Sequence, residues 1–414
     1  MLNMNYSFNR SYFGAVLAVG LFVLFVSLLP LTEAIHVVPL LLIFIGFFTF
    51  KKMTRFEGVY IYLLISLFIT VPIFISAVDA FDVEKTLIDG FRIGLYFLAG
   101  YVLLSLNKDR IEKKWSDILF YMVLLICLIW SFDAILQYIY GRNTLGYEYN
   151  NRRVTGFFHP KMRIGIILAH LLPFVMEACR RLHLRTSCSF FWLLFLPVLF
   201  VILIGGSRSS WVVAFLALSG YFVFLIWSGY LSKKIAVTGL IASIILVSVS
   251  YVFIPQFQSR VDQTAKIFNF DESSLNAATS RRGEVWSSAW TLFSENPVNG
   301  IGQGAMASMI EERQLASRGY PHAHFFVLDV MMYAGTIGLI FYVIAFFLMI
   351  YRVFYKFLGK NSSEFTLSLS AVLMCMPINT HWGIYSTLSS SIMCILIIFS
   401  FLRLSDAGSE QKIH

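Results

Sequence analysis

The sequence predicts an all-α polytopic membrane protein with about twelve transmembrane helices. Of its 414 residues, 58% are hydrophobic and only 13% are charged, about half the charged fraction of an ordinary soluble protein. The hydrophobic residues come in long blocks that lack the alternation of barrel strands. Helices are the expected spanning elements, because an open strand would leave its backbone groups unpaired in lipid. This composition excludes a soluble enzyme, a disordered protein and a coiled coil.

Twelve blocks are long and apolar enough to cross the hydrocarbon as helices, which takes about 20 residues and fewer in short or tilted cases. They cover residues 12–29, 36–50, 59–76, 91–106, 118–139, 161–176, 189–206, 210–228, 235–254, 323–350, 365–382 and 384–402. The first block is expected to be retained rather than cleaved as a signal peptide, because no small-x-small cleavage site follows it before Pro30.

The distribution of Lys and Arg predicts the orientation, since cytoplasmic loops are enriched in these residues. With the N-terminus in the cytoplasm, every inside loop is basic, and together these loops carry 18 of the 32 basic residues. An even number of spans then places both termini in the cytoplasm. The other 14 basic residues fall on the outer side, among 15 acidic residues. Outer loops normally avoid Lys and Arg, so this set suggests a function.

One long polar segment, residues 255–322, interrupts the membrane helices and is expected to fold as a helical loop domain on the outer face. It separates residues 1–254, with nine predicted spans, from residues 323–414, with three spans and a short cytoplasmic tail. Such a length is too great for a plain connector.

Two helices are expected within this loop domain. Over residues 280–295, Trp286, Trp290 and Phe293 share one helical face, which suits the membrane interface. Asn296-Pro297 ends this helix. A glycine-rich turn over 300–304 then leads into a second helix over 305–316.

Two histidines stand where the long segment enters the tenth span, in Tyr320-Pro321-His322-Ala323-His324. Asp329 follows inside that span. A neutral imidazole suits a general base, and nearby arginines favour the neutral form. The alternative is a pair of interfacial histidines that only bond to loops. A metal site is the weaker interpretation, because no third ligand is evident and the cysteines show no CxxC or Cys-His spacing; no metal or cofactor is therefore predicted.

The outer arginines gather in three segments. One surrounds Gly156-Phe157-Phe158-His159-Pro160, one is the turn before the eighth span, and one opens the helix of the loop domain. Their basic residues are Arg152, Arg153, Lys161 and Arg163, then Arg208, then Arg281 and Arg282. Guanidinium groups and helix N-termini both bind phosphate oxygens. The sequence thus predicts an outer-leaflet pocket for a phosphorylated or diphosphorylated lipid; the alternative is that these residues only pair with outer acids such as Glu284 and Glu295.

Four short motifs follow one another at the outer ends of the predicted spans. They are Thr155-Gly156-Phe157-Phe158-His159-Pro160; Gly206-Ser207-Arg208-Ser209-Ser210-Trp211; Arg282-x-x-x-Trp286 with Glu295-Asn296-Pro297-Val298-Asn299-Gly300-Ile301-Gly302; and Pro321-His322-Ala323-His324 with Tyr333-Ala334-Gly335-Thr336-Ile337-Gly338-Leu339. In order and spacing the chain resembles the bacterial O-antigen ligases, within the wider group of O-antigen ligases and polymerases. Two positions depart from the family pattern, which often has Asn where Phe325 stands and Glu where Ala334 stands.

The resemblance implies a GT-C-like membrane glycosyltransferase of the Gram-negative inner membrane. Such ligases move a finished O-antigen glycan from undecaprenyl diphosphate to the lipid A–core oligosaccharide on the periplasmic face, without metal, nucleotide or nucleic acid. His324 matches the family's histidine and is the expected general base, and Arg208 and Arg282 match its arginines and are expected to bind the diphosphate. Further candidates are Arg153, Arg163 and Arg281 for the diphosphate, and His322, His159, Lys161 and Asp329 as auxiliary residues.

Two other functions stay open. An O-antigen polymerase of the same group would extend the glycan rather than attach it. A polytopic transporter or lipid flippase is the more remote alternative, because such proteins usually bury acids near the membrane midplane and the predicted spans hold only Asp133 and Asp329, both at outer ends.

Overall fold

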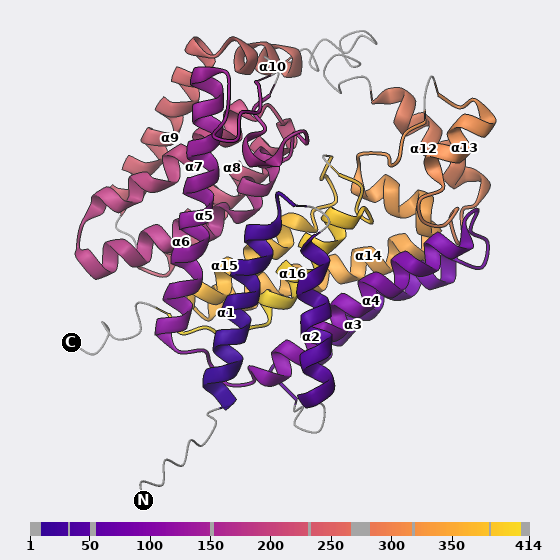
Figure 1. Ribbon diagram of the computed structural model, residues 1–414, viewed down its shortest axis with the longest axis horizontal. Coiled ribbons are helices and arrows are strands. Elements are labelled where there is room, and N and C mark those ends of the chain that lie inside the picture. Colours follow the sequence, from indigo (N-terminus) through magenta and orange to yellow (C-terminus); the bar gives the residue numbers. More distant parts are fainter. Residues whose placement is uncertain are drawn as a thin grey trace, which may run out of the picture.

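The computed structural model describes residues 10–31, 34–49, 55–149, 153–230, 233–265, 282–316, 319–380 and 382–406. About three quarters of these residues fold into helices, which pack into one bundle (Figure 1). Within these ranges the only β-type pairings are two isolated bridges, Ile111 with Leu404 and Arg142 with Glu148. The predicted all-α class is confirmed.

Each of the twelve predicted spans contains a helix, in the predicted order. These are α1 (Arg10–Leu28), α2 (Val37–Thr49), α3 (Val59–Ser76), α4 (Val83–Leu106), α5 (Lys113–Tyr140), α6 (Ile164–Thr186), α7 (Phe195–Ile204), α8 (Arg208–Trp227), α9 (Lys233–Phe253), α14 (Phe326–Leu358), α15 (Ser362–Met374) and α16 (Thr387–Ser400). A 3₁₀ turn, η4 (Ser189–Leu194), precedes α7.

Several of these helices have the length and composition of membrane spans. Among the described residues, α3, α4, α5, α8 and α14 are long and apolar enough to cross a membrane, and α9 with α10 would make a sixth span bent by 98°. The chain therefore has the apolar helices of a multi-pass membrane protein. Twelve spans, cytoplasmic termini and a GT-C-like fold stay predictions.

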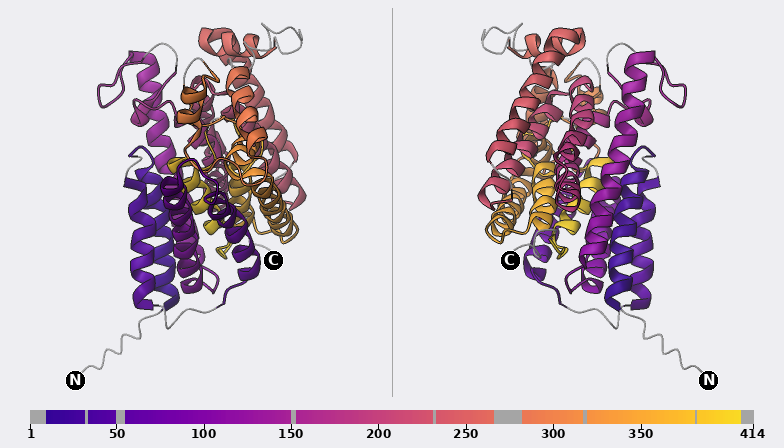
Figure 2. Two further views of the ribbon diagram at one scale, coloured as in Figure 1. Left: turned by 90° about the vertical axis from the view of Figure 1, so that its right-hand side faces the viewer. Right: turned by 90° about the vertical axis from the view of Figure 1, so that its left-hand side faces the viewer.

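Three further helices belong to the long segment between α9 and α14: α10 (Pro255–Ala265), α12 (Gly283–Glu295) and α13 (Met306–Arg313). They lie toward the end of the bundle opposite the start of α1 (Figures 1 and 2). The two helices predicted in this segment, over 280–295 and 305–316, correspond to α12 and α13. The division of the chain at 254 and 322 stays a prediction.

The buried face of α12 differs from the predicted aromatic face. Val285, Ala289 and Leu292 are buried, whereas Trp290 is 56% exposed. Trp286 lies at the boundary, where its ring centroid is 6.0 Å from that of Phe325. The placement of the aromatic face at the membrane interface stays a prediction, and α12 packs on the protein through a neighbouring apolar stripe.

Helix α14 is broken at Gly335, whose φ of 65° and ψ of −163° are not helical. The segment that follows α12 closes the break: the carbonyl of Pro297 accepts from the N–H of Thr336 at 2.8 Å, and that of Val298 accepts from Ile337 at 3.3 Å. These bonds satisfy backbone groups that the break would leave unpaired. A β-carbon at Gly335 would lie only 2.0 Å from the Val298 oxygen, so the close approach requires glycine.

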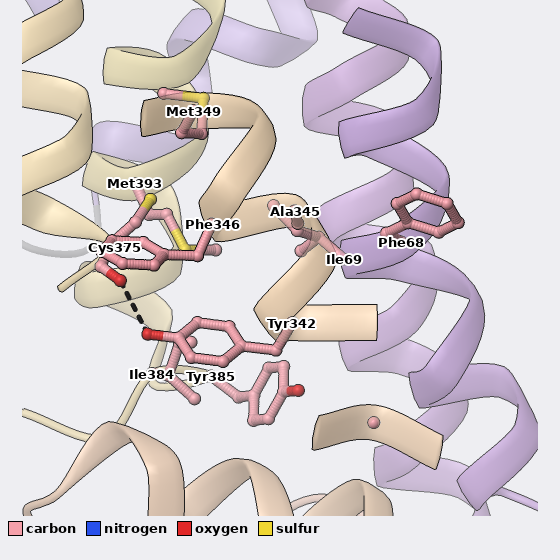
Figure 3. Close-up of a pocket in the computed structure, with 11 residues that line it drawn as sticks. Phe68, Ile69, Tyr342, Ala345, Phe346, Met349, Cys375, Ile384, Tyr385 and Met393 are labelled. Atoms are coloured by element: carbon pink, nitrogen blue, oxygen red, sulfur yellow. Dashed lines mark hydrogen bonds between the residues drawn. The ribbon is translucent and has the colours of Figure 1, made fainter. Parts of the chain in front are cut away.

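An apolar pocket of about 400 Å³ lies between α3, α14, α15 and α16 (Figure 3). Its walls include Phe68, Phe346 and Met349, and the hydroxyl of Tyr342 donates to the carbonyl of Cys375 at 2.6 Å. None of the side chains that line it is charged. The charged residues that could perform chemistry lie elsewhere.

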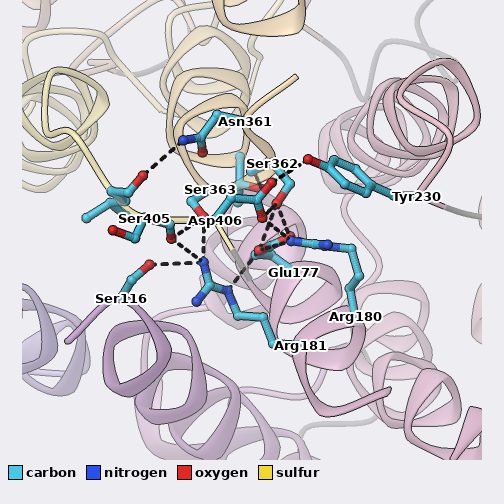
Figure 4. Close-up of polar contacts among 12 residues, drawn as sticks. Ser116, Glu177, Arg180, Arg181, Tyr230, Asn361, Ser362, Ser363, Ser405 and Asp406 are labelled. Carbon is cyan, nitrogen blue, oxygen red and sulfur yellow. Dashed lines mark hydrogen bonds and ion pairs between the residues drawn. The ribbon is translucent and has the colours of Figure 1, made fainter. Parts of the chain in front are cut away.

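A buried charged network ties together the end of the bundle near the start of α5 (Figure 4). In α6, Glu177 pairs with Arg180 at 2.9 Å and with Arg181 at 2.8 Å. Arg180 also pairs with Asp406 at 2.6 Å, and Arg181 pairs with Asp117. The hydroxyls of Ser362 and Ser363, at the start of α15, complete the network.

The sixth predicted span ends at residue 176, and the loop expected after it contains Arg180 and Arg181; the structure corrects this boundary. Helix α6 continues to Thr186, and both arginine residues are only 1% exposed. The local sequence could not reveal this, because the carboxylates that compensate the buried charge come from distant parts of the chain.

Candidate active site

Three of the predicted arginines come together from separate parts of the chain. Arg208 is the first residue of α8, Arg282 is the N-cap of α12, and Arg153 precedes the 3₁₀ turn at Gly156–Phe158. A β-carbon at Gly206 would lie 3.4 Å from Cγ of Arg153, so the Arg153 side chain lies across the turn that leads into α8.

The charges of these arginines act on one another. Burial, together with the guanidinium groups of Arg260, Arg282 and Arg208, lowers the pKa of Arg153 to about 10. Burial and the charge of Arg208 also lower the pKa of Arg282. Positive groups gathered this closely disfavour one another's charged state. An anion placed among these arginines would therefore relieve their mutual repulsion.

Helix α10 adds a fourth guanidinium that the sequence did not single out. The charge of Arg260 contributes to the lowered pKa of Arg153. Gln263, one turn further along α10, accepts a hydrogen bond from Nη2 of Arg208 at 3.4 Å. The rings of Trp211 and Phe257 pack 4.7 Å apart and hold α10 against α8. In the sequence Arg260 is one of the 14 outer basic residues, and only the fold of the 255–322 segment decides its neighbours.

The two histidines of the turn before α14, which we call the histidine turn (residues 321–325), lie next to the arginines. The ring centroids of His322 and His324 are 4.1 Å apart at 63°. Burial and the neighbouring groups of His324, Arg163 and Arg282 lower the pKa of His322 to about 3. The imidazole of His322 is therefore neutral at physiological pH, and the predicted base and the predicted phosphate ligands share one region.

Three side chains, one from α12 and two from α14, hold the histidine turn. Nε1 of Trp286 donates to the Ala323 carbonyl at 3.1 Å, and Oδ1 of Asp329 accepts from the Ala323 N–H at 2.7 Å. The hydroxyl of Tyr333 donates to the Pro321 carbonyl at 2.7 Å. His324 takes the left-handed conformation, with φ of 54°, which a non-glycine residue adopts rarely and only when its surroundings impose it.

The segment before α16 also approaches the histidine turn. A β-carbon at Gly383 would lie 2.7 Å from Cβ of His322, so this glycine lets the chain approach the histidine. The hydroxyls of Ser209 and Thr380 lie 2.5 Å apart and join the start of α8 to the same segment. In the sequence Gly383 only separates the predicted spans 365–382 and 384–402.

The remaining predicted site residues occupy different positions. Arg163 is the N-cap of α6, and its charge contributes to the lowered pKa of His322. The side chains of His159 and Lys161 are exposed. Arg281 and Arg152 lie outside the described residues. Among the residues that the structure describes, no three His, Cys, Asp or Glu side chains are grouped to hold a metal ion.

Residues 192–343 match a family model described as O-antigen ligase. This part of the chain is similar to the O-antigen ligase family. The matched segment contains Arg208, Arg282 and the histidine turn, while Arg153 and Arg163 lie before it. The family consists of glycosyltransferase-like ligases and polymerases that use lipid-linked glycans, so the similarity supports an enzymatic role. No curated protein matches the chain.

Proposed function

We propose that the protein is an O-antigen ligase that transfers the O-antigen glycan from undecaprenyl diphosphate to the lipid A–core on the periplasmic face of the inner membrane. One observation carries this proposal: the histidine turn lies beside the arginine cluster. The charge of Arg282 lowers the pKa of His322. Trp286, on the helix that Arg282 caps, donates a hydrogen bond to the carbonyl of Ala323. A base beside a set of cations suits a reaction in which a hydroxyl loses a proton while a diphosphate departs.

The arginine cluster binds the donor diphosphate in this proposal. Arg208 and Arg282 are the main ligands, supported by Arg153, Arg163 and, from the sequence alone, Arg281. Guanidinium forks fit phosphate oxygens, and fixed cations stabilise the negative charge that grows on the leaving diphosphate. Binding the anion also relieves the mutual repulsion that lowers the pKa of Arg153.

His324 acts as the general base. Its imidazole takes the proton of a core hydroxyl, and that oxygen bonds to the anomeric carbon of the glycan as the bond from this carbon to the diphosphate oxygen breaks. Attack opposite the leaving group inverts the anomeric configuration. The histidine turn supplies the proton acceptor and the arginines supply the charge, so the step is proposed to need no metal or nucleotide.

The auxiliary residues have supporting roles. Asp329 holds the backbone of the histidine turn through Ala323, and His322 lies beside His324 as a neutral imidazole. Lys161 lies on the exposed turn between Arg153 and Arg163, where its charge adds to the field that attracts the anionic donor.

The decisive experiment is transfer by the purified protein. Supplied with lipid A–core and an undecaprenyl-diphosphate glycan, in the presence of a chelator and without nucleotide, the wild-type protein should form the joined product. The His324→Ala variant should lose nearly all product, and the Arg313→Ala variant, which removes an exposed partner of Glu295, should not. Full activity of His324→Ala would rule out the proposed mechanism.

Deletion of the gene separates the ligase from the polymerase. Cells without a ligase should accumulate lipid-linked polymer and make bare lipid A–core. Cells without a polymerase should still cap their core with a single repeat unit, and this second phenotype would assign the protein to polymerisation instead. Normal attachment together with a transport defect would favour the transporter alternative.

A further inference from the structure

A stacked aromatic pair stands exposed on the loop that carries Arg153 and Arg163. The rings of Tyr147 and His159 lie 4.3 Å apart at an interplanar angle of 12°, which is a stacked arrangement. Tyr147 is 40% exposed, and His159 is also exposed. Each ring covers one face of the other, and both side chains keep an exposed surface.

One buried amide holds the two halves of this pair together. Nε2 of Gln137 donates to the Tyr147 carbonyl at 3.2 Å, while its Oε1 accepts from the N–H groups of Thr155 and Gly156 at 2.8 and 2.9 Å. The backbone beside Tyr147 is thereby joined to the turn that leads to His159. A buried glutamine whose amide oxygen and nitrogen are both bonded rigidifies the loops it joins.

A second buried side chain fixes the loop in which Tyr147 lies. Asp133, which is fully buried, accepts from the N–H of Thr144 at 2.9 Å and from Nδ2 of Asn143 at 3.2 Å. Oδ1 of Asn143 in turn accepts from the N–H of Tyr147 at 2.8 Å. The aromatic pair therefore stands on a loop that is ordered before any ligand arrives, which lowers the entropy cost of binding.

The position of the pair relates it to the charged site. Arg153, whose pKa responds to Arg208 and Arg282, stands two residues before Thr155, and Arg163 stands four residues after His159. A sugar attached to a diphosphate held by these arginines would have its next rings beside this loop. The exposed ion pair of Arg142 and Glu148, 3.2 Å apart on the same loop, offers a donor and an acceptor for hydroxyl groups.

We propose that Tyr147 and His159 form a stacking platform for a pyranose ring of the donor glycan. This inference rests on the proposed function. The C–H face of a pyranose packs on an aromatic ring, while its hydroxyls bond to polar groups at the ring edge. Tyrosine suits such contacts because it offers a large amphipathic surface at a low cost in side-chain entropy. The platform holds the donor rather than the acceptor, because it shares its loop with the arginines assigned to the donor diphosphate.

Steady-state transfer kinetics test the platform. Tyr147→Ala should raise the KM for a donor that carries several sugars by about ten-fold, since a lost stacking contact of this size changes affinity to about that extent. The KM for the acceptor and kcat should stay within about two-fold. Tyr147→Phe keeps the ring and should restore the wild-type KM. Tyr140→Ala, which removes an aromatic side chain that is 75% exposed next to the same loop, serves as the control and should behave as wild type.

Two results would overturn the assignment. A selective rise in the acceptor KM would mean that the platform holds the core oligosaccharide. A lower thermal unfolding midpoint in Tyr147→Ala with an unchanged donor KM would mean that the stack only stabilises the loop.

A binding experiment separates this inference from the proposed function. The probe is the free polysaccharide released by mild acid from the surface of the host cell, and saturation-transfer NMR measures its contact with the protein in nanodiscs. Wild type should transfer saturation to the polysaccharide and Tyr147→Ala should not; no transfer to wild type overturns the platform even if the enzyme is active. Binding by wild type without any transfer reaction overturns the ligase function instead.

Discussion

Nε1 of Trp286 donates a hydrogen bond to the carbonyl of Ala323 at 3.1 Å. Because Trp286 lies one turn after Arg282, this bond connects the helix that begins at a phosphate-binding candidate to the turn between the two histidines. The proposed base and the proposed cation are thus held in one unit. The family pattern Arg-x-x-x-Trp has a physical reason in this bond.

We predict that Trp286→Phe slows transfer without unfolding the protein. Phenylalanine keeps the ring beside Phe325 but cannot donate to Ala323. A neutral hydrogen bond contributes about 0.5–1.5 kcal/mol, so kcat should fall by about three- to ten-fold. Trp290→Phe, at an exposed position of the same helix, is the control and should keep the wild-type kcat. Equal rates for both variants would show that the bond does not position the histidines.

Loss of Arg208 or Arg282 should slow transfer more than Trp286→Phe does. Charge-assisted hydrogen bonds contribute about 1.5–3 kcal/mol, so Arg208→Ala and Arg282→Ala should each reduce kcat/KM by about ten- to one-hundred-fold or more. Lysine should restore only part of the activity, because it keeps the charge but not the planar fork. Transfer assays on purified variants measure this. Activity of Arg208→Ala within about two-fold of wild type would remove Arg208 from the site.

The low pKa of His322 predicts a loss of stability in acid. Its native pKa is about 3, because of burial and nearby positive groups, whereas an unfolded chain has a histidine pKa of about 6.5. As pH falls from about 6.5 toward 3, the histidine is protonated in the unfolded state but stays neutral in the native state. The free energy of unfolding therefore decreases over this range, and above pH 6.5 this contribution is constant. Thermal unfolding at pH 7.5 and pH 5 should show a larger decrease in midpoint for wild type than for His322→Gln. Equal decreases would contradict the assignment.

Substitution of Gly335 should destabilise the protein strongly. Alanine there would meet the Val298 oxygen and would be strained at a φ of 65°. The strain alone costs about 1–3 kcal/mol, and separation of the two segments would break the backbone bonds that close α14. Thermal unfolding in the same detergent should show a lower midpoint for Gly335→Ala. Gly20→Ala is the control, since a β-carbon there meets no atom within 4 Å.

The buried network around Glu177 should stabilise the end of the bundle far from the site. Glu177→Leu would leave Arg180 and Arg181 buried without their shared carboxylate, at a cost of about 3–5 kcal/mol. Glu295→Ala breaks an exposed pair with Arg313 and should cost at most about 1 kcal/mol. Thermal unfolding should show a much larger decrease in midpoint for Glu177→Leu than for Glu295→Ala. A small effect at Glu177 would mean that Asp406 and Asp117 suffice to balance both arginines.

The sequence predicted the helices well, because their signal is local. A block of apolar residues must form a helix in lipid, and each predicted block contains one. The same local signal failed at α6, where Glu177, Arg180 and Arg181 resembled a polar loop. Charge in a sequence shows only that a partner or water is needed, and here the partner Asp406 is more than two hundred residues away.

The sequence predicted several residues of the candidate site, and their roles stay predictions. The residue types of the histidine turn and of the arginine segments indicated a base and an anion site, and the structure brings Arg153, Arg208 and Arg282 into one cluster next to His322. Arg260, Gly383 and the roles of Trp286 and Gln137 were missed. Each of these acts through contacts between segments far apart in the chain, and no local spacing encodes such contacts.

The sequence by itself determined that this protein is helical, apolar and equipped with histidine and arginine on one set of loops. Hydrophobic blocks and residue chemistry are properties of short segments, so they can be recognised without a fold. Only the tertiary structure decided which arginines share a cluster, which bonds hold the histidine turn, and that Gln137 places Tyr147 against His159. These relationships depend on packing between distant helices, where a few ångströms separate a shared site from unrelated surface charges.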